Sequence, residues 1–227
     1  KKFTVLKTKE HQNSEVGIAR CILNELQPEH EVFVCEMGAY NRGGIRLLAS
    51  IAKPQLGMLT GINEQHIATF GSQENIVKAK YDLIESLPTN GVAFFNAKNS
   101  YCIELYNKTT VKKILYGQAA SFRGGENILG AMAVAKELGM SDQEISSAVK
   151  EIENTFPGAQ IRKSAGGLTI IEATYSANPD GVIAGLEYLK TWPGKKIMVM
   201  PCLIELGKAT KEAHKRIGAK IAEVCDL

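Results

Sequence analysis

The sequence has little of what marks a membrane protein or a nucleic-acid-binding protein. No apolar run approaches the roughly 18 residues that a membrane-spanning helix needs, and the first residues do not read as a signal peptide. Lysine and arginine number 27 against 24 aspartates and glutamates, and they are spread along the chain. A net charge of +3 gives no electrostatic basis for binding nucleic acid. We therefore expect no membrane partner and no nucleic-acid partner.

Cysteine is scarce and irregularly placed. The five cysteines are odd in number and no two form a C-x-x-C pair, which argues against a zinc site or a thioredoxin-type redox site. Scattered, unpaired cysteines fit a reducing compartment. We therefore expect a cytoplasmic protein, and we expect it to act as a monomer.

What the sequence does contain is an alternation of strand-like and helix-like segments. Its 227 residues suggest one large or two small domains. Ser141 and Glu144 have the spacing of a capping box, so a helix should begin there and run to about residue 153. Successive βα units predict an α/β fold with parallel pairing. We predict strands at residues 3–6, 32–35, 56–59, 91–96, 101–106, 168–171 and 196–200.

Two polar residues follow the predicted strands at 32–35 and 56–59. Glu36 comes directly after the first strand, and His66 follows the second after a short loop. Ligands of open α/β sheets bind beyond the carboxyl ends of the strands, so we expect both side chains at one edge of one parallel sheet. A carboxylate and an imidazole there could hold a divalent metal. Taken singly, each residue is more often a solvated glutamate or a packed histidine.

Lys80 stands where an apolar residue is expected. The predicted helix at 73–87 has an apolar stripe, and Lys80 lies three or four residues from Ile76, Val77, Leu83 and Ile84. A buried, unpaired ammonium is costly. Either the amine of Lys80 snorkels outward, or it has a partner inside the protein.

Several motifs together resemble the Mur ligase family, in particular its branch that adds D-alanyl-D-alanine to a muramoyl tripeptide. They extend over nearly the whole chain and include the turns Glu205-Leu206-Gly207 and Asn178-Pro179. The others are Glu36 with Gly38, Asn63 with His66, Phe70 to Ser72, and Ala79 with Lys80.

The resemblance implies a fold and an activity. We expect a parallel-sheet, P-loop-type central domain at residues 1–160, followed by a partial Rossmann-like C-terminal domain at 161–227. The implied activity is ATP-dependent formation of an amide bond through an acyl phosphate in peptidoglycan precursor synthesis. The implied substrates are a nucleotide-sugar peptide and an amino acid or dipeptide, and the implied cofactors are ATP and Mg²⁺.

The resemblance also implies roles for single residues. Glu36, His66 and a carboxylated Lys80 would ligate magnesium, with Lys80 and His66 taking part in catalysis. Asn13 would contact the nucleotide-sugar substrate. The nucleotide would be contacted by Asn127, Arg162, Tyr175 and Asn178. Asn127 and Asn13 have alternatives that the sequence leaves open, a helix N-cap for the first and a polar turn for the second.

The chain departs from the family pattern in places. Ala159 and Ala173 replace an arginine and an aspartate of the family, and no G-x-x-x-x-G-K-[ST] loop occurs in the 227 residues. Such a loop supplies the amides and the lysine that hold ATP phosphates. We therefore expect an incomplete ligase that alone does not hydrolyse ATP at a ligase-like rate. Two alternatives are a non-catalytic binding protein derived from such a ligase and a ligase similar to folylpolyglutamate synthase.

Overall fold

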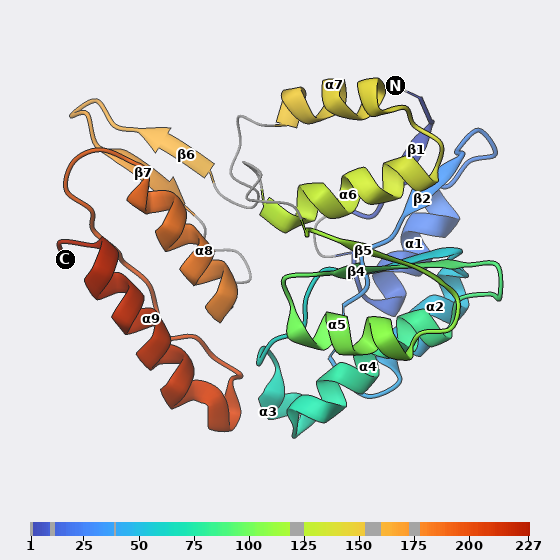
Figure 1. The fold of residues 1–227 in the computed structure, drawn as a ribbon, viewed down its shortest axis with the longest axis horizontal. Helices are drawn as coiled ribbons and strands as arrows, with labels where there is room; N and C mark the ends of the chain where they lie inside the picture. The colour runs from blue at the N-terminus through green and yellow to red at the C-terminus, as the bar shows by residue number, and fades with distance from the viewer. Residues whose placement is uncertain (1, 10–11, 39, 119–124, 153–159, 173–177) are drawn as a thin grey trace. The chain divides into compact units, whose positions relative to one another are not determined.

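The computed structural model describes residues 2–9, 12–38, 40–118, 125–152, 160–172 and 178–227 (Figure 1). The chain divides into two compact units, Lys1–Ile62 with Glu74–Val149 and Asn63–Gln73 with Lys150–Leu227. Helices and strands alternate, and the sheets of the first unit are parallel, which confirms the predicted α/β class. In the part of the chain that the structure describes, no helix is both long and apolar enough to span a membrane.

Strands and helices alternate along the first unit. Its strands are β1 (Val5–Lys7), β2 (Val32–Val34), β3 (Leu56–Leu59), β4 (Val92–Asn96) and β5 (Lys112–Tyr116). Its helices are α1 (Glu15–Glu25), α2 (Gly44–Ala52), α4 (Gln73–Glu85), α5 (Ser100–Lys108), α6 (Gly125–Glu137) and most of α7 (Asp142–Ile152).

The core of the first unit is a three-stranded parallel sheet in the order β3-β4-β5. All five residues of the central strand β4 are buried, as expected for a parallel strand covered on both faces. α6 packs on the face that carries Val92 and Phe94, and α5 lies on the other side (Figure 1). There the rings of Phe95 and Tyr106 meet edge to face, with centroids 5.8 Å apart.

The remaining helices of this unit extend the core. α7 packs on the outer side of α6 through Ile145 and Val149, which contact Ile128. Its capping box is present: the Glu144 amide donates to Ser141 Oγ at 3.3 Å, and Glu144 Oε2 accepts from the Ser141 amide at 2.7 Å. This confirms the predicted start of α7. α1 and α2 pack together through a separate apolar cluster of Ile18, Ile45 and Leu48.

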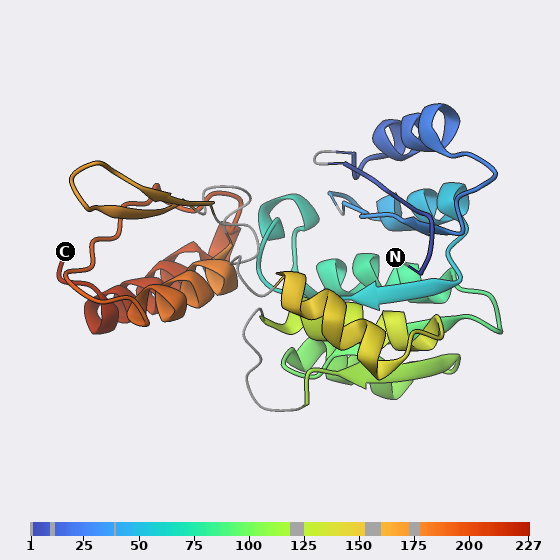
Figure 2. The same cartoon turned by 90° about the horizontal axis from the view of Figure 1, so that it is seen from above.

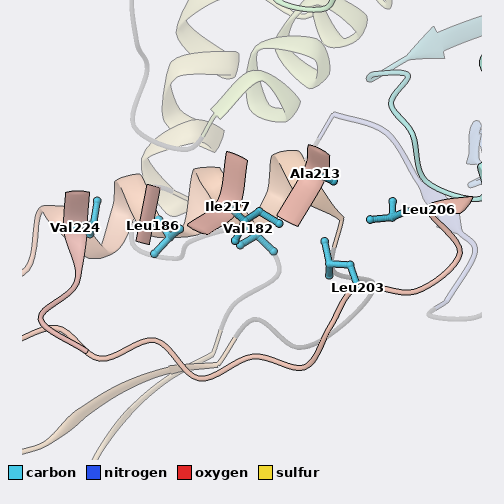
Figure 3. Close-up of a cluster of buried hydrophobic side chains, with 7 residues drawn as sticks. All are labelled: Val182, Leu186, Leu203, Leu206, Ala213, Ile217 and Val224. Atoms are coloured by element: carbon cyan, nitrogen blue, oxygen red, sulfur yellow. The ribbon is translucent and has the colours of Figure 1, made fainter. Parts of the chain in front are cut away.

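The second unit is built on two helices that lie side by side (Figures 1 and 2). Its elements are α3 (Ile67–Phe70), β6 (Gln160–Lys163), β7 (Thr169–Glu172), α8 (Pro179–Lys190), the short 3₁₀ helix η1 (Gly207–Ala209) and α9 (Thr210–Val224). Figure 3 shows the buried cluster between α8, α9 and the segment that joins them, formed by Val182, Leu186, Leu203, Leu206, Ala213, Ile217 and Val224.

The strand predicted at residues 101–106 is wrong, because these residues belong to helix α5. The side chain of Asn99 caps the helix by accepting from the Cys102 amide at 3.1 Å. Cys102 and Leu105 are buried, and their spacing of three residues places them on one helix face. A run of six mostly apolar residues is too short for its periodicity to separate strand from helix.

The parallel pairing predicted for the strands at 168–171 and 196–200 is also wrong. β7 pairs with β6 in an antiparallel hairpin. Residues 196–200 form no strand, although the Met198 amide donates to the Leu227 carbonyl at 3.0 Å. The alternation that suggested a strand is real, since Ile197 and Val199 are exposed while Met198 packs on the buried cluster of this unit.

The prediction that Glu36 and His66 follow strands of one sheet is wrong for the described residues. β2, which precedes Glu36, is hydrogen-bonded to β1, whereas β3, which precedes His66, is hydrogen-bonded to β4. These are two separate sheets. The apolar runs identified the two strands correctly but carry no information about which partners they choose.

Candidate active site

Glu36 lies two residues beyond the end of β2, in a segment that is hydrogen-bonded to the residues before α1. The Glu36 amide donates to Thr8 Oγ1 at 3.1 Å, and Asn13 Nδ2 donates to Glu36 Oε1 at 3.3 Å. The Gly38 amide donates to the Asn13 carbonyl at 2.8 Å. A Cβ at Gly38 would lie 3.1 Å from Asn13 Cγ and 3.2 Å from its carbonyl oxygen, so glycine permits this close approach. The structure therefore brings Asn13 and Glu36 together.

Lys80 has a partner inside the first unit. Its Nζ donates to the Gly61 carbonyl, just beyond β3, at 3.1 Å. Its neighbours Ile76 and Ala79 on α4 are buried, and burial lowers the pKa of Lys80 below its usual range. Of the two alternatives for Lys80, the structure thus supports an internal partner over snorkelling.

Three side chains hold the loop at residues 60–62 by donating to its three successive carbonyls. Asn96 Nδ2 donates to residue 60 at 2.8 Å, Lys80 Nζ to residue 61 at 3.1 Å, and Asn99 Nδ2 to residue 62 at 2.9 Å. Asn96 is itself buried, and Asn99 also caps α5. The amine of Lys80 is therefore held against a loop that two further side chains also anchor.

His66 belongs to the second compact unit, where it precedes α3. Its Nδ1 contacts Glu205 Oε2. The amide of Ala68 donates to the Glu205 carbonyl at 3.1 Å. His66 and Glu205 both have left-handed backbone conformations, with φ of 66° and 63°. Residues 63–73, which carry His66, thus pack with the C-terminal part of the chain.

Asn178 is the N-cap of α8, and its Oδ1 accepts from the Gly181 amide at 2.9 Å. The same oxygen accepts from Asn63 Nδ2 at 3.3 Å, and that amide group also lies 3.3 Å from Asp180 Oδ2. Two residues of the predicted motifs, Asn63 and Asn178, therefore meet in the second unit. Tyr175, the nucleotide contact predicted near them, lies outside the described residues.

Two further predicted nucleotide contacts, Arg162 and Asn127, lie on β6 and α6. Arg162 on β6 pairs with Glu172 on β7 at 3.0 Å, which is a cross-strand contact of the hairpin. Asn127 is exposed within the first turn of α6, which begins at Gly125. The alternative of Asn127 as a helix N-cap is therefore wrong. Ala159 and Ala173 lie outside the described residues.

A shallow pocket of about 300 Å³ opens between α2 and α4. It contains none of the residues predicted for the site. Within it, Arg46 is already paired with Asp82 at 2.8 Å. Its lining residues are Arg42, Gly43, Arg46, Asn75, Lys78, Ala79 and Asp82.

The donor chemistry of the site fits magnesium at Glu36. Its carboxylate is exposed, and carboxylate oxygens are ligands that Mg²⁺ prefers. Lys80 as an amine is a donor, and only carboxylation would convert it into an oxygen ligand. Among the described residues, no three side chains of His, Cys, Asp or Glu converge in a group able to hold a metal ion.

Sequence reasoning missed three residues that shape the site, namely Asn96, Asn99 and Glu205. The two asparagines stand at and just beyond the end of β4. Asparagine side chains at such positions often bind neighbouring backbone groups, so their place in the sequence could have indicated this role. The sequence indicates Glu205 only as part of a turn. Its contact with His66 spans 139 residues, so no local pattern indicates it.

The chain belongs to the Mur ligase family. Residues 1–159 match the Mur ligase middle domain, and residues 159–227 match the Mur ligase glutamate ligase domain. The division into residues 1–160 and 161–227 stays a proposal, because the compact units do not follow it: residues 63–73 lie in the unit of the C-terminal part.

Its relatives include UDP-N-acetylmuramoyl-tripeptide–D-alanyl-D-alanine ligases. The chain is 30% identical over 245 residues to that of Synechocystis sp., with 96% of this chain and 53% of that protein covered. It is 27% identical over 252 residues to that of Bacillus subtilis, with 97% and 55% covered. The chain thus spans about half the length of the curated relatives it matches.

Solved structures share the fold. The MurF ligase of Thermotoga maritima in complex with ADP superposes with a TM-score of 0.80 at 25% identity, covering 97% of this chain and 58% of that one. A MurF crystal structure from Acinetobacter baumannii gives a TM-score of 0.83 at 24% identity, covering 98% and 56%. At these identities the likeness is mainly one of fold.

Proposed function

We propose that the chain is part of an ATP-dependent ligase that joins D-alanyl-D-alanine to a UDP-muramoyl tripeptide in peptidoglycan precursor synthesis. In this reaction the terminal phosphoryl group of ATP is transferred to a substrate carboxylate, and ADP leaves. The amine of the dipeptide then attacks the acyl carbon, phosphate leaves, and an amide bond forms. The names of the relatives support this substrate pair.

The observation that carries the proposal is the placement of Lys80. Its amine is partly buried against a loop held by Asn96 and Asn99, and burial lowers its pKa. A lower pKa leaves more of the amine neutral, and a neutral amine adds to carbon dioxide, with loss of one proton, to give a carbamate. The carbamate would supply oxygen atoms that the amine lacks.

We also propose Glu36 and His66 as magnesium ligands, and Asn13 donates to the carboxylate of Glu36. Magnesium would neutralise charge that develops on the transferred phosphoryl group. In the structure the side-chain amide of Asn13 donates to Glu36. To contact the nucleotide-sugar substrate as well, the same amide would have to bind both groups.

For the nucleotide we propose Asn127, Arg162, Tyr175 and Asn178 as contacts. The complex of a Thermotoga maritima relative with ADP supports nucleotide binding by this fold. Arg162 would have to leave Glu172, its partner in the hairpin. That the protein acts as a cytoplasmic monomer is also part of the proposal.

A binding experiment on the 227-residue chain tests the proposal. Isothermal titration with Mg²⁺ in the presence of bicarbonate should give a site that Glu36→Gln and Lys80→Ala each weaken by at least tenfold. Glu212→Gln, an exposed residue of α9, is the matched control. Equal Mg²⁺ affinity in all four proteins would contradict the proposed ligands.

A further inference from the structure

We propose that Glu205 is a positioning residue for His66, fixing the tautomer and the orientation of its imidazole ring. The inference deepens the proposed function, and it rests on that function for the role of His66 as a ligand. Nothing in the motifs assigned Glu205 such a role.

Both the side chain and the main chain of Glu205 contact the segment that carries His66. The carboxylate meets His66 Nδ1, and the carbonyl accepts from the Ala68 amide at 3.1 Å. The His66 side chain is only 26% exposed in this arrangement. The His66 carbonyl in turn accepts from the Phe70 amide at 3.0 Å and from Thr69 Oγ1 at 2.7 Å. The main chain and the ring of His66 are thus fixed by separate contacts.

The backbone conformations of His66 and Glu205 also support the proposal. His66 and Glu205 have φ of 66° and 63°, a left-handed conformation that is unfavourable for a residue with a side chain. Such conformations persist where the surroundings over-determine them, and they concentrate at functional sites. Gly207 follows with φ of 50°, and a Cβ there would lie 3.1 Å from Cγ2 of Ile67. The turn at 205–207 is therefore shaped to receive α3.

The chemistry of the pair selects one tautomer. An ionised carboxylate only accepts hydrogen bonds, so the hydrogen lies on Nδ1 of His66. In the neutral ring the lone pair then lies on Nε2, the nitrogen suited to a metal. Histidines that bind metals almost always donate their other N–H to a carboxylate, a carbonyl or water, which fixes the tautomer and raises the basicity of the ligand.

The competing explanation is that Glu205 merely docks the segment on the second unit. Other contacts also dock it, since Asn63 meets Asn178 at 3.3 Å and Glu64 pairs with Arg216 at 3.5 Å. The main-chain bond from Ala68 does not depend on the side chain at 205. Glu205→Gln should therefore keep the segment in place while changing the ring of His66, and this separates the two explanations.

The test is a long-range ¹H–¹⁵N correlation of the histidine rings in the labelled 227-residue chain at pH 8. His66→Gln assigns the signals. In the unaltered chain, His66 should show the Nδ1–H tautomer alone. In Glu205→Gln it should show a mixture, because the amide can donate as well as accept. Glu205→Asp should retain part of the preference, and Glu212→Gln is the control.

His214 supplies a reference in the same spectrum. Its Nδ1 lies 2.8 Å from the Thr210 carbonyl and its Nε2 accepts from the Leu203 amide at 3.1 Å, so its tautomer should not change in any variant. A His66 signal in Glu205→Gln identical to that of Glu212→Gln would overturn the proposal.

A second arm adds Mg²⁺ with bicarbonate and follows the same signals. Glu205→Gln should bind about 10–100-fold more weakly, the usual loss for such a partner of a ligand. If Mg²⁺ leaves the His66 signal of the unaltered chain unchanged, the metal role of His66 fails. In that case the tautomer result still decides whether Glu205 positions the ring.

Discussion

Among single residues, Lys80 is the one whose chemical state decides what the candidate site can do. A protonated amine repels a metal ion, whereas a neutral amine can be carboxylated. Burial has the largest effect on the amine of Lys80 and lowers its pKa. Among the residues that the structure describes, this amine donates a hydrogen bond to a carbonyl, and no carboxylate compensates its charge. Keeping the amine of Lys80 charged in this environment therefore costs free energy.

This cost predicts a pH dependence. The pKa of Lys80 is lower in the folded chain than its ordinary value of 10.5, so between these two values the unfolded state binds more protons and stability rises with pH. Below the lowered pKa the destabilisation is fully present, and above 10.5 it is gone. Relative to Lys80→Met, the unaltered chain should therefore gain free energy of unfolding as pH rises toward 10.5.

Urea unfolding at several pH values between neutral and alkaline measures this difference. Lys78→Met, on the exposed face of the same helix, is the control and should show no such trend. A constant difference between the unaltered chain and Lys80→Met across that range would contradict the account of Lys80.

At the scale of elements, the junction of β4 and α5 supports the loop beside Lys80. Asn99→Ala removes the cap of α5 and the donor to the carbonyl of residue 62. We expect a loss of about 1–3 kcal/mol in the free energy of unfolding. Asn107→Ala, at an exposed position of the same helix, should change it by less than about 0.5 kcal/mol. Equal effects of the two substitutions, measured by urea unfolding, would argue against the role of Asn99.

The elements differ in how well the sequence predicted them. β3 was predicted with its correct ends because a short apolar run stands between polar residues. The apolar stripe predicts α4, and Lys80 is conspicuous because it interrupts that stripe. Residues 101–106 of α5 resemble a strand, because this mixture of apolar and polar residues fits either period and the Asn99 cap decides for the helix.

The candidate site was predictable only where its residues depart from a local pattern. Lys80 is such a case. Glu205 is not such a case, because a glutamate in a turn is common and the role of this one depends on its contact with His66. The membership of β2 and β3 in different sheets was likewise beyond the sequence pattern, since strand pairing depends on contacts between distant residues.

For the whole molecule, the division into compact units makes a prediction about residues 63–73. Leu186→Ala, at a side chain that is 1% exposed in the α8–α9 cluster, should cost about 2–5 kcal/mol. Amide hydrogen exchange should then quicken at Ala68, whose amide donates to Glu205. Exchange in β4 should change far less, because β4 belongs to the other compact unit and local unfolding can be confined to one cooperative unit.

Hydrogen exchange followed by mass spectrometry distinguishes the outcomes. Val92→Ala, in the sheet of the first unit, is the reciprocal variant and should quicken exchange in β4 more than at Ala68. If Leu186→Ala leaves exchange at Ala68 unchanged while α8 and α9 exchange faster, residues 63–73 do not belong with the second unit.

The central claim is that Lys80 serves as a carbamate in a ligase of the Mur type, and ¹³C NMR tests it most directly. The chain is incubated with ¹³C-bicarbonate and Mg²⁺ at pH 8, with Lys80→Ala and Lys78→Ala as matched variants. The account predicts one carbamate resonance that is present in the unaltered chain and in Lys78→Ala and absent from Lys80→Ala. A spectrum of the unaltered chain without a carbamate resonance, or a resonance that survives in Lys80→Ala, would contradict it.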